Sequence, residues 1–196
     1  HGTSHQYVNC RTAELMKEDV HQLNMITCHL GNGASITAIK NGKCVNTSMG
    51  LTPLGGIMMG TRSGDLDPSV VFYMAKKLNC TPEEMDVYLN KKSGMLGVSG
   101  ISSDARDIQA ALEQGNPRAQ LTVDIYTNRA INVIGGYYMQ LGHVDAIAFT
   151  AGLGENDTQT RERILKGLEE GMGLSIDYEL NRQIRGKEWL ISKPDS

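Results

Sequence analysis

Residues 24–50, NMITCHLGNGASITAIKNGKCVNTSMG, decide how this chain folds. The pattern predicts three short strands, Leu23–His29, Ala34–Lys40 and Lys43–Thr47. Asn41-Gly42, between the second and third strands, is the pair most typical of a two-residue β-hairpin. The stretch therefore predicts an antiparallel start to a sheet.

The turn after the first strand, Gly31-Asn32-Gly33, contains two glycines and an asparagine. Backbone N–H groups at such a tip are expected to lack partners, and without a Cβ an anion can approach them closely. An ordinary hairpin has the same pattern, so these residues alone leave both interpretations open.

The composition is that of a globular protein with no nucleic-acid footprint. The 196 residues suit one large domain, with 40% hydrophobic and 21% charged residues. A net charge of −3 and 5% aromatic residues argue against a nucleic-acid partner. No apolar run approaches membrane-spanning length, and we expect no signal peptide. The four cysteines lack zinc-site spacing, which favours reduced thiols in a cytoplasmic protein. Because the chain starts at His1, not Met, we expect a fragment.

The N-terminal segment predicts a helix with Ser4 as its N-cap. His1 and His5 are four residues apart, so they could meet on one helix face and bind a metal. No third ligand is adjacent, and we favour a histidine at the edge of a cleft that donates to an anionic group.

Residues 51–68 are too rich in glycine and proline for regular structure, yet they are largely apolar. A loop of this length is usually functional or disordered, and its apolar content argues against disorder. Arg62 stands here among small residues. Either it forms a salt bridge with Asp65 or Asp67, or its guanidinium faces a phosphate or carboxylate.

Four helices follow with clear start signals. Asp67-Pro68 and the capping box Thr81-Pro82-Glu83-Glu84 are typical N-termini. The predicted spans are 67–78, 81–94, 102–115 and 117–141, the last containing Gly135-Gly136.

A second glycine-rich segment lies between an expected buried strand, Val144–Thr150, and an expected helix, Thr158–Glu170. We predict a turn at Ala151–Asn156, where free N–H groups and a helix N-terminus would attract an anion. The pattern is neither G-x-G-x-x-G nor the P-loop. A further helix is expected at Ile176–Arg185, followed by the apolar patch Trp189–Ile191.

Four segments together resemble the acetate kinase family: HGTSHQYV (1–8), CHLGNGASI (28–36), NTSMGLTPLGGIMMGTRSGDLDP (46–68) and FTAGLGEN (149–156). The resemblance implies an α/β fold, a ribonuclease H-like domain of the actin, sugar kinase and heat-shock ATPase superfamily, with a mixed sheet flanked by helices. It implies that residues 1–196 are the C-terminal nucleotide-binding domain, without the family's N-terminal domain and closing segment.

The resemblance also implies roles for individual residues. His1 and Arg62 would stabilise the transition state. The first phosphate loop would be formed by His29, Leu30, Gly31, Asn32 and Gly33. The adenine side would be lined by Asp104, Ala105 and Arg106. The second phosphate loop would be formed by Gly152, Leu153, Gly154, Glu155 and Asn156. No metal ligand falls in this chain, and the ligands of Mg²⁺ are expected outside it. Asn46 and Gly55 depart from the family's usual Asp and Glu.

The implied activity is ATP-dependent phosphorylation of acetate to acetyl phosphate, in a cytoplasmic homodimer with helix 117–141 in the contact. A propionate or butyrate kinase is one alternative, and a non-catalytic ATPase-fold module is another. His1 and Arg62 favour an enzyme, because a mere nucleotide clamp needs neither. By itself, the chain is expected to bind ADP or ATP weakly and to show no turnover.

Overall fold

The computed structural model describes all 196 residues, His1–Ser196. The chain divides into two compact units, one formed by residues 1–48 and 127–196 and the other by residues 49–126. The two units are described in turn.

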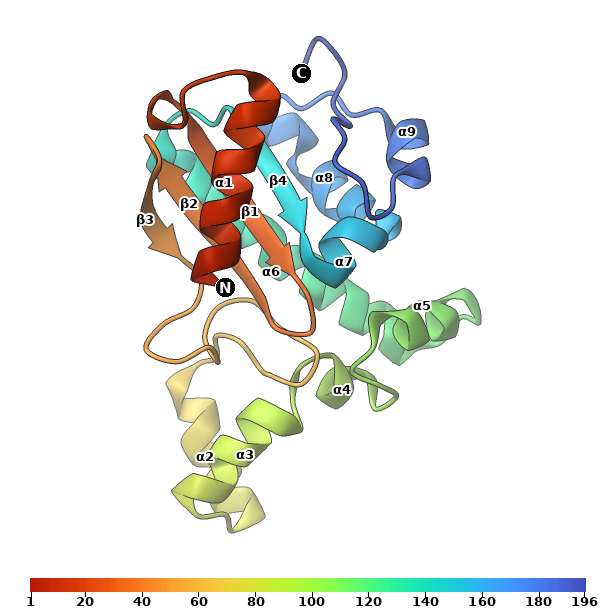
Figure 1. The fold of residues 1–196 in the computed structure, drawn as a ribbon. Coiled ribbons are helices and arrows are strands. Elements are labelled where there is room, and N and C mark those ends of the chain that lie inside the picture. The colour runs from red at the N-terminus through yellow and green to blue at the C-terminus, as the bar shows by residue number, and fades with distance from the viewer. The chain divides into compact units, whose positions relative to one another are not determined.

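The first unit is built on one mixed sheet of four strands, β1 (Asn24–Leu30), β2 (Ala34–Lys40), β3 (Lys43–Thr47) and β4 (Ala146–Thr150), in the order β3-β2-β1-β4 (Figure 1). β1–β2 and β2–β3 are antiparallel, whereas β4 runs parallel to β1. The prediction of one sheet is confirmed, with β1 displaced by one residue. Asn41 and Gly42 have φ values of 51° and 75°, as the hairpin turn requires.

β4 is shorter and more exposed than predicted. It begins at Ala146 instead of Val144, and all five of its residues are only half-buried. β4 is an edge strand, so it pairs with β1 on one side and with no strand on the other. Just before the strand, the Asp145 carboxylate accepts a hydrogen bond of 2.7 Å from the N–H of Asn24, and the Asp145 N–H donates to the Asn24 carbonyl at 2.8 Å.

α1 (Gly2–Met16) lies across one face of the sheet (Figure 1) and presents a buried stripe, His5, Asn9 and Ala13. His1 is its N-cap, so the prediction of Ser4 was wrong. The Ser4 hydroxyl is hydrogen-bonded to the His29 ring instead. The far end of the stripe is apolar, since Ala13 packs in a cluster with Leu23, Met25 and Ile39 beside the short 3₁₀ helix η1 (Val20–Gln22).

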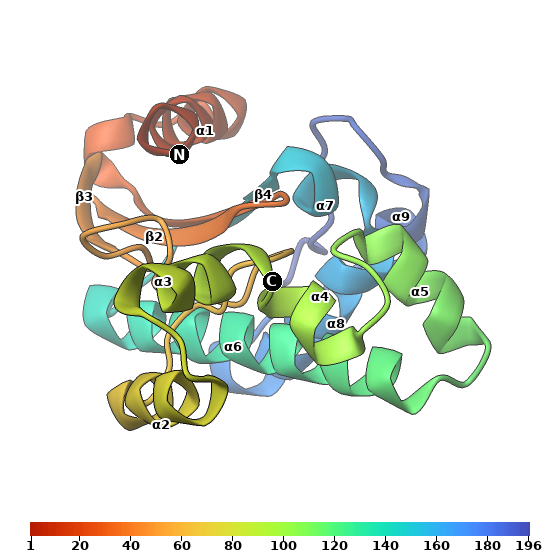
Figure 2. The ribbon, with the colours of Figure 1, turned by 90° about the horizontal axis from the view of Figure 1, so that it is seen from below.

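α6 (Pro117–Leu141) begins in the second unit and ends in the first, so only its residues 127–141 belong to the unit that holds the sheet. Figure 2 shows the sheet between α1 and the later part of α6. Gly135-Gly136 do not interrupt α6, which is consistent with a cost of only about 1 kcal/mol for a glycine inside a helix.

Three helices follow β4 in the first unit: α7 (Ala151–Asn156), α8 (Thr158–Met172) and α9 (Tyr178–Gln183). The predicted glycine turn at 151–156 is therefore helical. α9 is shorter than predicted because the Asp177 side chain caps it and Ile176 forms a bridge with Ser192. Trp189 and Leu190 are exposed.

The second unit contains α2 (Pro68–Leu78), α3 (Pro82–Lys91), α4 (Gly94–Ser99) and α5 (Ala105–Glu113). The predicted caps Asp67 and Thr81 are confirmed, the latter with the full capping box. α3 ends before Gly94, which opens the unpredicted α4. α5 begins later than predicted, because Asp104 and not Ser102 caps it.

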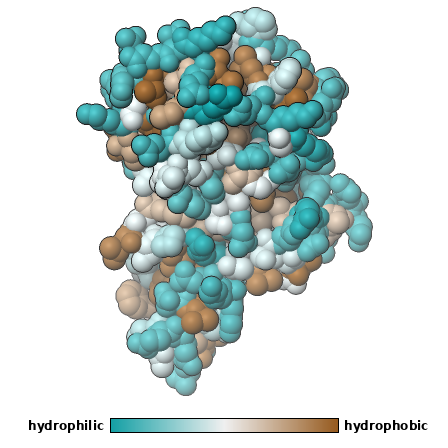
Figure 3. All heavy atoms as spheres, in the orientation of Figure 1, coloured by the Kyte–Doolittle hydropathy of each residue, from teal (hydrophilic) through white to brown (hydrophobic).

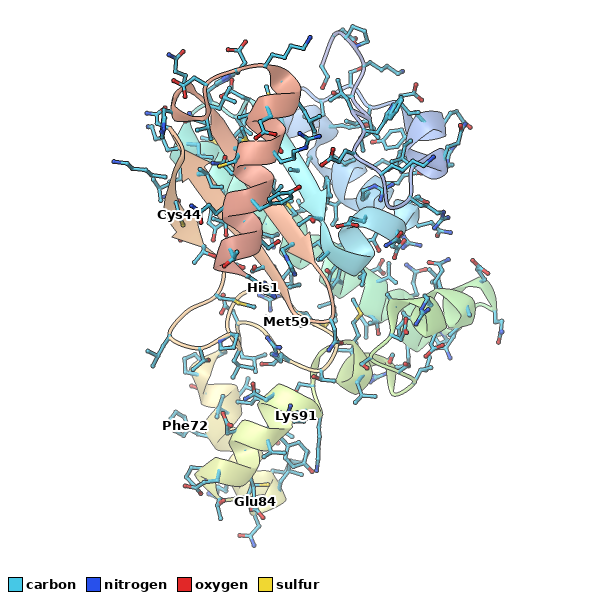
Figure 4. The ribbon with its side chains drawn as sticks, in the orientation of Figure 1. His1, Cys44, Met59, Phe72, Glu84 and Lys91 are labelled. Atoms are coloured by element: carbon cyan, nitrogen blue, oxygen red, sulfur yellow. The ribbon has the colours of Figure 1, made fainter.

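Exposed apolar side chains are conspicuous on α2, which buries none of its residues. Phe72 and Tyr73 are exposed there, and Phe72 points away from the helix pair α2–α3 (Figure 4). Figure 3 shows such hydrophobic residues scattered over a largely hydrophilic face. None of the helices has both the length and the apolar character needed to cross a membrane.

Candidate functional site

The two glycine-rich segments of the first unit lie side by side. β1 and β4 are parallel neighbours in which His29 pairs with Thr150, so both strands end at the same edge of the sheet. A Cβ placed on Gly31 would lie 3.6 Å from the Cβ of Ala151. The structure thus brings together residues 29–33 and 152–156, as the sequence predicted.

The first loop offers fewer free donors than expected. The Gly31 N–H donates to the Gly33 carbonyl at 3.1 Å, so it is occupied within the turn. Asn32 and Gly33 donate no such backbone bond. A Cβ on Gly31 would lie 3.2 Å from the Gly33 oxygen, so this tight turn favours glycine.

The second loop enters its helix through a sharp bend at Ala151, whose φ is 65°. A positive φ is unusual for alanine and stores strain of about 1 kcal/mol or more. The Glu155 carboxylate holds this bend, accepting hydrogen bonds of 3.0 Å from the Ala151 N–H and the Thr150 hydroxyl. Glu155 therefore takes a donor that we expected to face a phosphate.

The two glycines of α7 differ in their surroundings. A Cβ on Gly154 would lie 3.3 Å from the carbonyl carbon of Phe149 and 3.6 Å from the Cys28 oxygen, so glycine allows α7 to pack closely on β1 and β4. At Gly152 nothing lies within 4 Å of the corresponding position. The space over Gly152 is therefore open to a ligand.

A polar cluster adjoins the two loops beneath the N-terminus of α1. His29 and Ser35 are paired across β1 and β2, so their side chains share the face that α1 covers. The rings of His1 and His29 have centroids 4.0 Å apart, and Figure 4 shows His1 at this end of α1. His1 of the predicted site is thus beside the first loop.

Ser35 joins two histidines through one hydroxyl group. Its Oγ is hydrogen-bonded to His1 Nδ1 and to His5 Nε2, each at 2.7 Å. The other ring nitrogen of His5 is bonded to the Thr27 hydroxyl at 2.6 Å. Sequence reasoning missed Ser35 and Thr27, although strand alternation alone places Thr27 and His29 on one face.

Burial lowers the pKa values of the two inner histidines, His5 and His29. Desolvation, followed by the neighbouring His29, lowers the pKa of His5 to about 4. The pKa of His29 is also lowered, chiefly by burial and then by the α-amino group at His1, while Glu155 opposes the shift. His1 and His5 do share a side of α1, but no three or more His, Cys, Asp or Glu side chains are grouped to hold a metal ion.

In the second unit, Arg62 has no carboxylate partner. Its Nη1 donates to the Pro53 carbonyl at 3.0 Å and to the Met59 sulfur at 3.5 Å. Asp65 accepts instead from the Gly56 N–H, and Asp67 caps α2. The salt-bridge interpretation of Arg62 was therefore wrong, and its remaining N–H groups are free to bind an anion.

The Arg62 loop depends on Gly94, which the sequence indicated only as a helix stop. Gly94 has φ 63°, and a Cβ there would lie 2.2 Å from the Met59 oxygen and 2.8 Å from the Arg62 oxygen. Any side chain would push this loop away, so Gly94 positions the backbone on which Arg62 stands.

The predicted adenine-side residues begin α5. Asp104 caps the helix at the Arg106 N–H and also pairs with the Arg106 guanidinium at 2.5 Å. These bonds to Arg106 lower the pKa of Asp104 to about 2. The pair fixes the start of α5 at a surface position, since the Arg106 side chain is 90% exposed.

The model of the acetokinase family matches residues 1–196, the whole chain. The chain belongs to the acetokinase family. It is 55% identical over 196 residues to the acetate kinase of Clostridium botulinum strain Okra. The match covers all of this chain and 49% of that protein. The chain thus spans about half the length of the curated relatives it matches.

Two solved structures share the fold of this family member. The acetate kinase of Porphyromonas gingivalis is 47% identical with a TM-score of 0.97, and the match covers 100% of this chain and 49% of that one. A propionate kinase from Francisella tularensis is 39% identical with a TM-score of 0.92, again covering 100% and 49%. The expected α/β fold, with a mixed sheet flanked by helices, is confirmed.

Proposed function

We propose that residues 1–196 are the C-terminal nucleotide-binding domain of an acetate kinase, which transfers the γ-phosphoryl group of ATP to acetate and forms acetyl phosphate. The observation that carries the proposal is the placement of two family motifs, 28–36 and 149–156, at one edge of the sheet. Backbone N–H groups there would hold the nucleotide phosphates without a P-loop lysine.

We infer that His1 and Arg62 stabilise the transferring phosphoryl group. The transition state is loose and spreads charge over the equatorial oxygens, so positioned donors lower the barrier. Because Ser35 engages His1 at Nδ1, Nε2 is left to donate. Arg62 lacks a carboxylate partner and supplies a planar cation. Each donor would contribute on the order of 3 kcal/mol.

The remaining inferred contacts are with ATP or ADP. Residues 29–33 and 152–156 would hold phosphates, and Asp104–Arg106 would line the adenine side. Mg²⁺ would accompany the nucleotide and neutralise phosphate charge, and no three or more His, Cys, Asp or Glu side chains of this chain are grouped around a common point. We propose that its protein ligands lie outside these residues and assign the metal no step.

A chimera tests the proposal. This chain replaces the matching 196 residues of the Clostridium botulinum acetate kinase, with which it is 55% identical. We expect the chimera to form acetyl phosphate from ATP and acetate at a rate within about tenfold of the parent, since the exchanged halves are 55% identical over 196 residues. A folded chimera that binds ADP but forms no acetyl phosphate would contradict it.

A propionate or butyrate kinase is the second candidate, and the propionate kinase from Francisella tularensis with TM-score 0.92 favours it. The kcat/KM values of the chimera for acetate, propionate and butyrate, compared with those of the parent, test whether this half of the protein contributes to selectivity. An unchanged ranking assigns the choice of carboxylate to residues outside this chain. A non-catalytic module is disfavoured by the unpaired Arg62.

We further propose a cytoplasmic homodimer in which α6 forms part of the contact. All four cysteines are free, as in a reducing compartment, and α6 exposes Leu121 and Met139. Light scattering of the chimera should give twice the protomer mass. Met139→Lys should shift the distribution toward monomer, and a strict monomer at high concentration would contradict the proposal.

A further inference from the structure

Arg161 on α8 is a buried cation without an ionic partner. Its residue is only 4% exposed, and no carboxylate lies within ion-pair distance of it. Desolvation by burial lowers the pKa of its guanidinium, while the charge of Asp157 opposes the shift. A buried guanidinium without a carboxylate partner is stabilised by hydrogen bonds to the groups around it.

All five N–H donors of Arg161 are used, and every acceptor belongs to one of two segments. Nη1 donates to the carbonyls of Gly154 and Glu155 at 2.9 Å each, at the end of α7. Nε bonds the Asn181 side chain at 2.9 Å, and Nη2 bonds the carbonyls of Asn181 and Ile184 at 3.1 and 2.6 Å. The guanidinium therefore joins α7 to α9.

The same tail holds the last carbonyls of α7. The Asn156 oxygen accepts from Arg185 Nη1 at 2.6 Å, and the Glu155 oxygen accepts from the Gly186 N–H at 3.2 Å. The other end of α7 begins at the strained Ala151, with φ 65°. Because a strained bend persists only where its surroundings fix it, the anchored end helps to hold the bend at residue 151.

We propose that Arg161 and Arg185 are positioning residues for the second phosphate loop, which set the affinity of the site for nucleoside diphosphates and triphosphates through the backbone of α7. Neither side chain needs to touch the ligand. This inference rests on the proposed function, because it takes residues 152–156 as contacts of the nucleotide phosphates.

Two exposed arginines of the tail form a matched pair for the test. Arg185 bonds the Asn156 carbonyl, whereas Arg182 pairs with Glu162 and Glu179 and forms no hydrogen bond or ion pair with α7. Calorimetric titration of the chain with ADP, well below the unfolding temperature, compares Arg185→Ala with Arg182→Ala. Loss of one charged hydrogen bond should raise the Kd of Arg185→Ala about tenfold and leave that of Arg182→Ala unchanged.

Two further readouts separate positioning from general stability. Amide hydrogen exchange at 151–156 should be faster in Arg185→Ala, and Arg185→Lys should restore most of the affinity because it retains a charged donor. Arg161→Lys, which cannot supply five donors in one plane, should bind ADP more weakly still.

The outcomes are distinct. Equal ADP affinity and equal exchange at 151–156 in the wild type, Arg182→Ala and Arg185→Ala would overturn the positioning role while leaving the proposed function intact. A wild-type chain with no measurable affinity for ADP would overturn the proposed function as well.

Discussion

A single hydroxyl group, that of Ser35, connects the candidate catalytic histidine to the buried one. A neutral imidazole has one N–H and one lone pair, so His5 donates to one of Thr27 and Ser35 and accepts from the other. When Ser35 donates to His1 Nδ1, a neutral His1 carries its proton on Nε2 and can donate it to an oxygen. The hydrogen bond from Ser35 can thus orient a neutral His1 so that its Nε2–H is available to a ligand oxygen.

The buried His5 makes stability depend on pH. Its pKa is about 4 in the folded state and ordinarily 6.5, so only the unfolded chain takes up this proton between these values. The contribution of neutral His5 is complete above pH 6.5, falls as the pH drops, and is lost below about 4. Its size is on the order of 3 kcal/mol. In urea unfolding at pH 7 and pH 5, His5→Gln should lose less stability on acidification than the wild type.

The exposed His21, which forms no ion pair, is the control for this experiment. His21→Gln should retain the pH dependence of the wild type. An equally steep loss in His5→Gln and the wild type would show that His5 is not the group that titrates.

Arg62 is the residue on which turnover should depend most in the second unit. In the chimera, Arg62→Ala should lower kcat by about 10²- to 10³-fold, the usual effect of removing one transition-state donor. Arg62→Lys should recover little, because a point charge does not replace a planar fork. Steady-state kinetics of the two Arg62 variants measures these kcat values, with Arg182→Ala as the control. Near-normal kcat in both Arg62 variants would show that Arg62 has only a structural role.

At the scale of elements, two helical glycines with the same open surroundings, Gly152 and Gly171, allow a test of the second loop. Gly152 in α7 and Gly171 in α8 both have open space at the Cβ position and no positive φ. Replacing either by alanine should therefore preserve or raise stability by about 0.5–1 kcal/mol.

Only Gly152→Ala should affect ligand binding. Its methyl group would occupy the space that we assign to a phosphate, and the Kd for ADP should rise about tenfold or more. Thermal unfolding and ADP titration of Gly152→Ala and Gly171→Ala make the comparison. If both variants bound ADP like the wild type, the loop would not contact the phosphates.

The elements with local signals were predictable, and those fixed by distant contacts were not. Asp67-Pro68 and the Thr81 capping box act within one turn, so their helices begin where predicted. α7 was missed because its end is held by Arg161 and Arg185, which lie 7 and 29 residues from the carbonyls they bond at Gly154 and Asn156. α4 was missed because Gly94 was interpreted as a stop when its positive φ serves a close backbone approach.

At the scale of the whole molecule, the family motifs predicted the fold and the neighbouring placement of two loops. The hydrogen-bond network of His1, His5 and Ser35 could not be predicted from them. The sequence predicted three antiparallel strands and a fourth strand in the same sheet, but not that β4 pairs with β1 in parallel. The sharing of Ser35 by His1 and His5 depends on how α1 lies across the sheet, and no sequence pattern specified that packing.

The central claim is that the paired loops bind a nucleotide, and amide chemical-shift mapping tests it most directly. ADP is titrated into the isotope-labelled chain. We predict saturable shifts in both loops, at Gly31, Asn32, Gly33, Gly152 and Gly154, with little change in the C-terminal tail beyond Gly186. Saturable shifts that spare both loops, or the absence of any shift, would contradict the account.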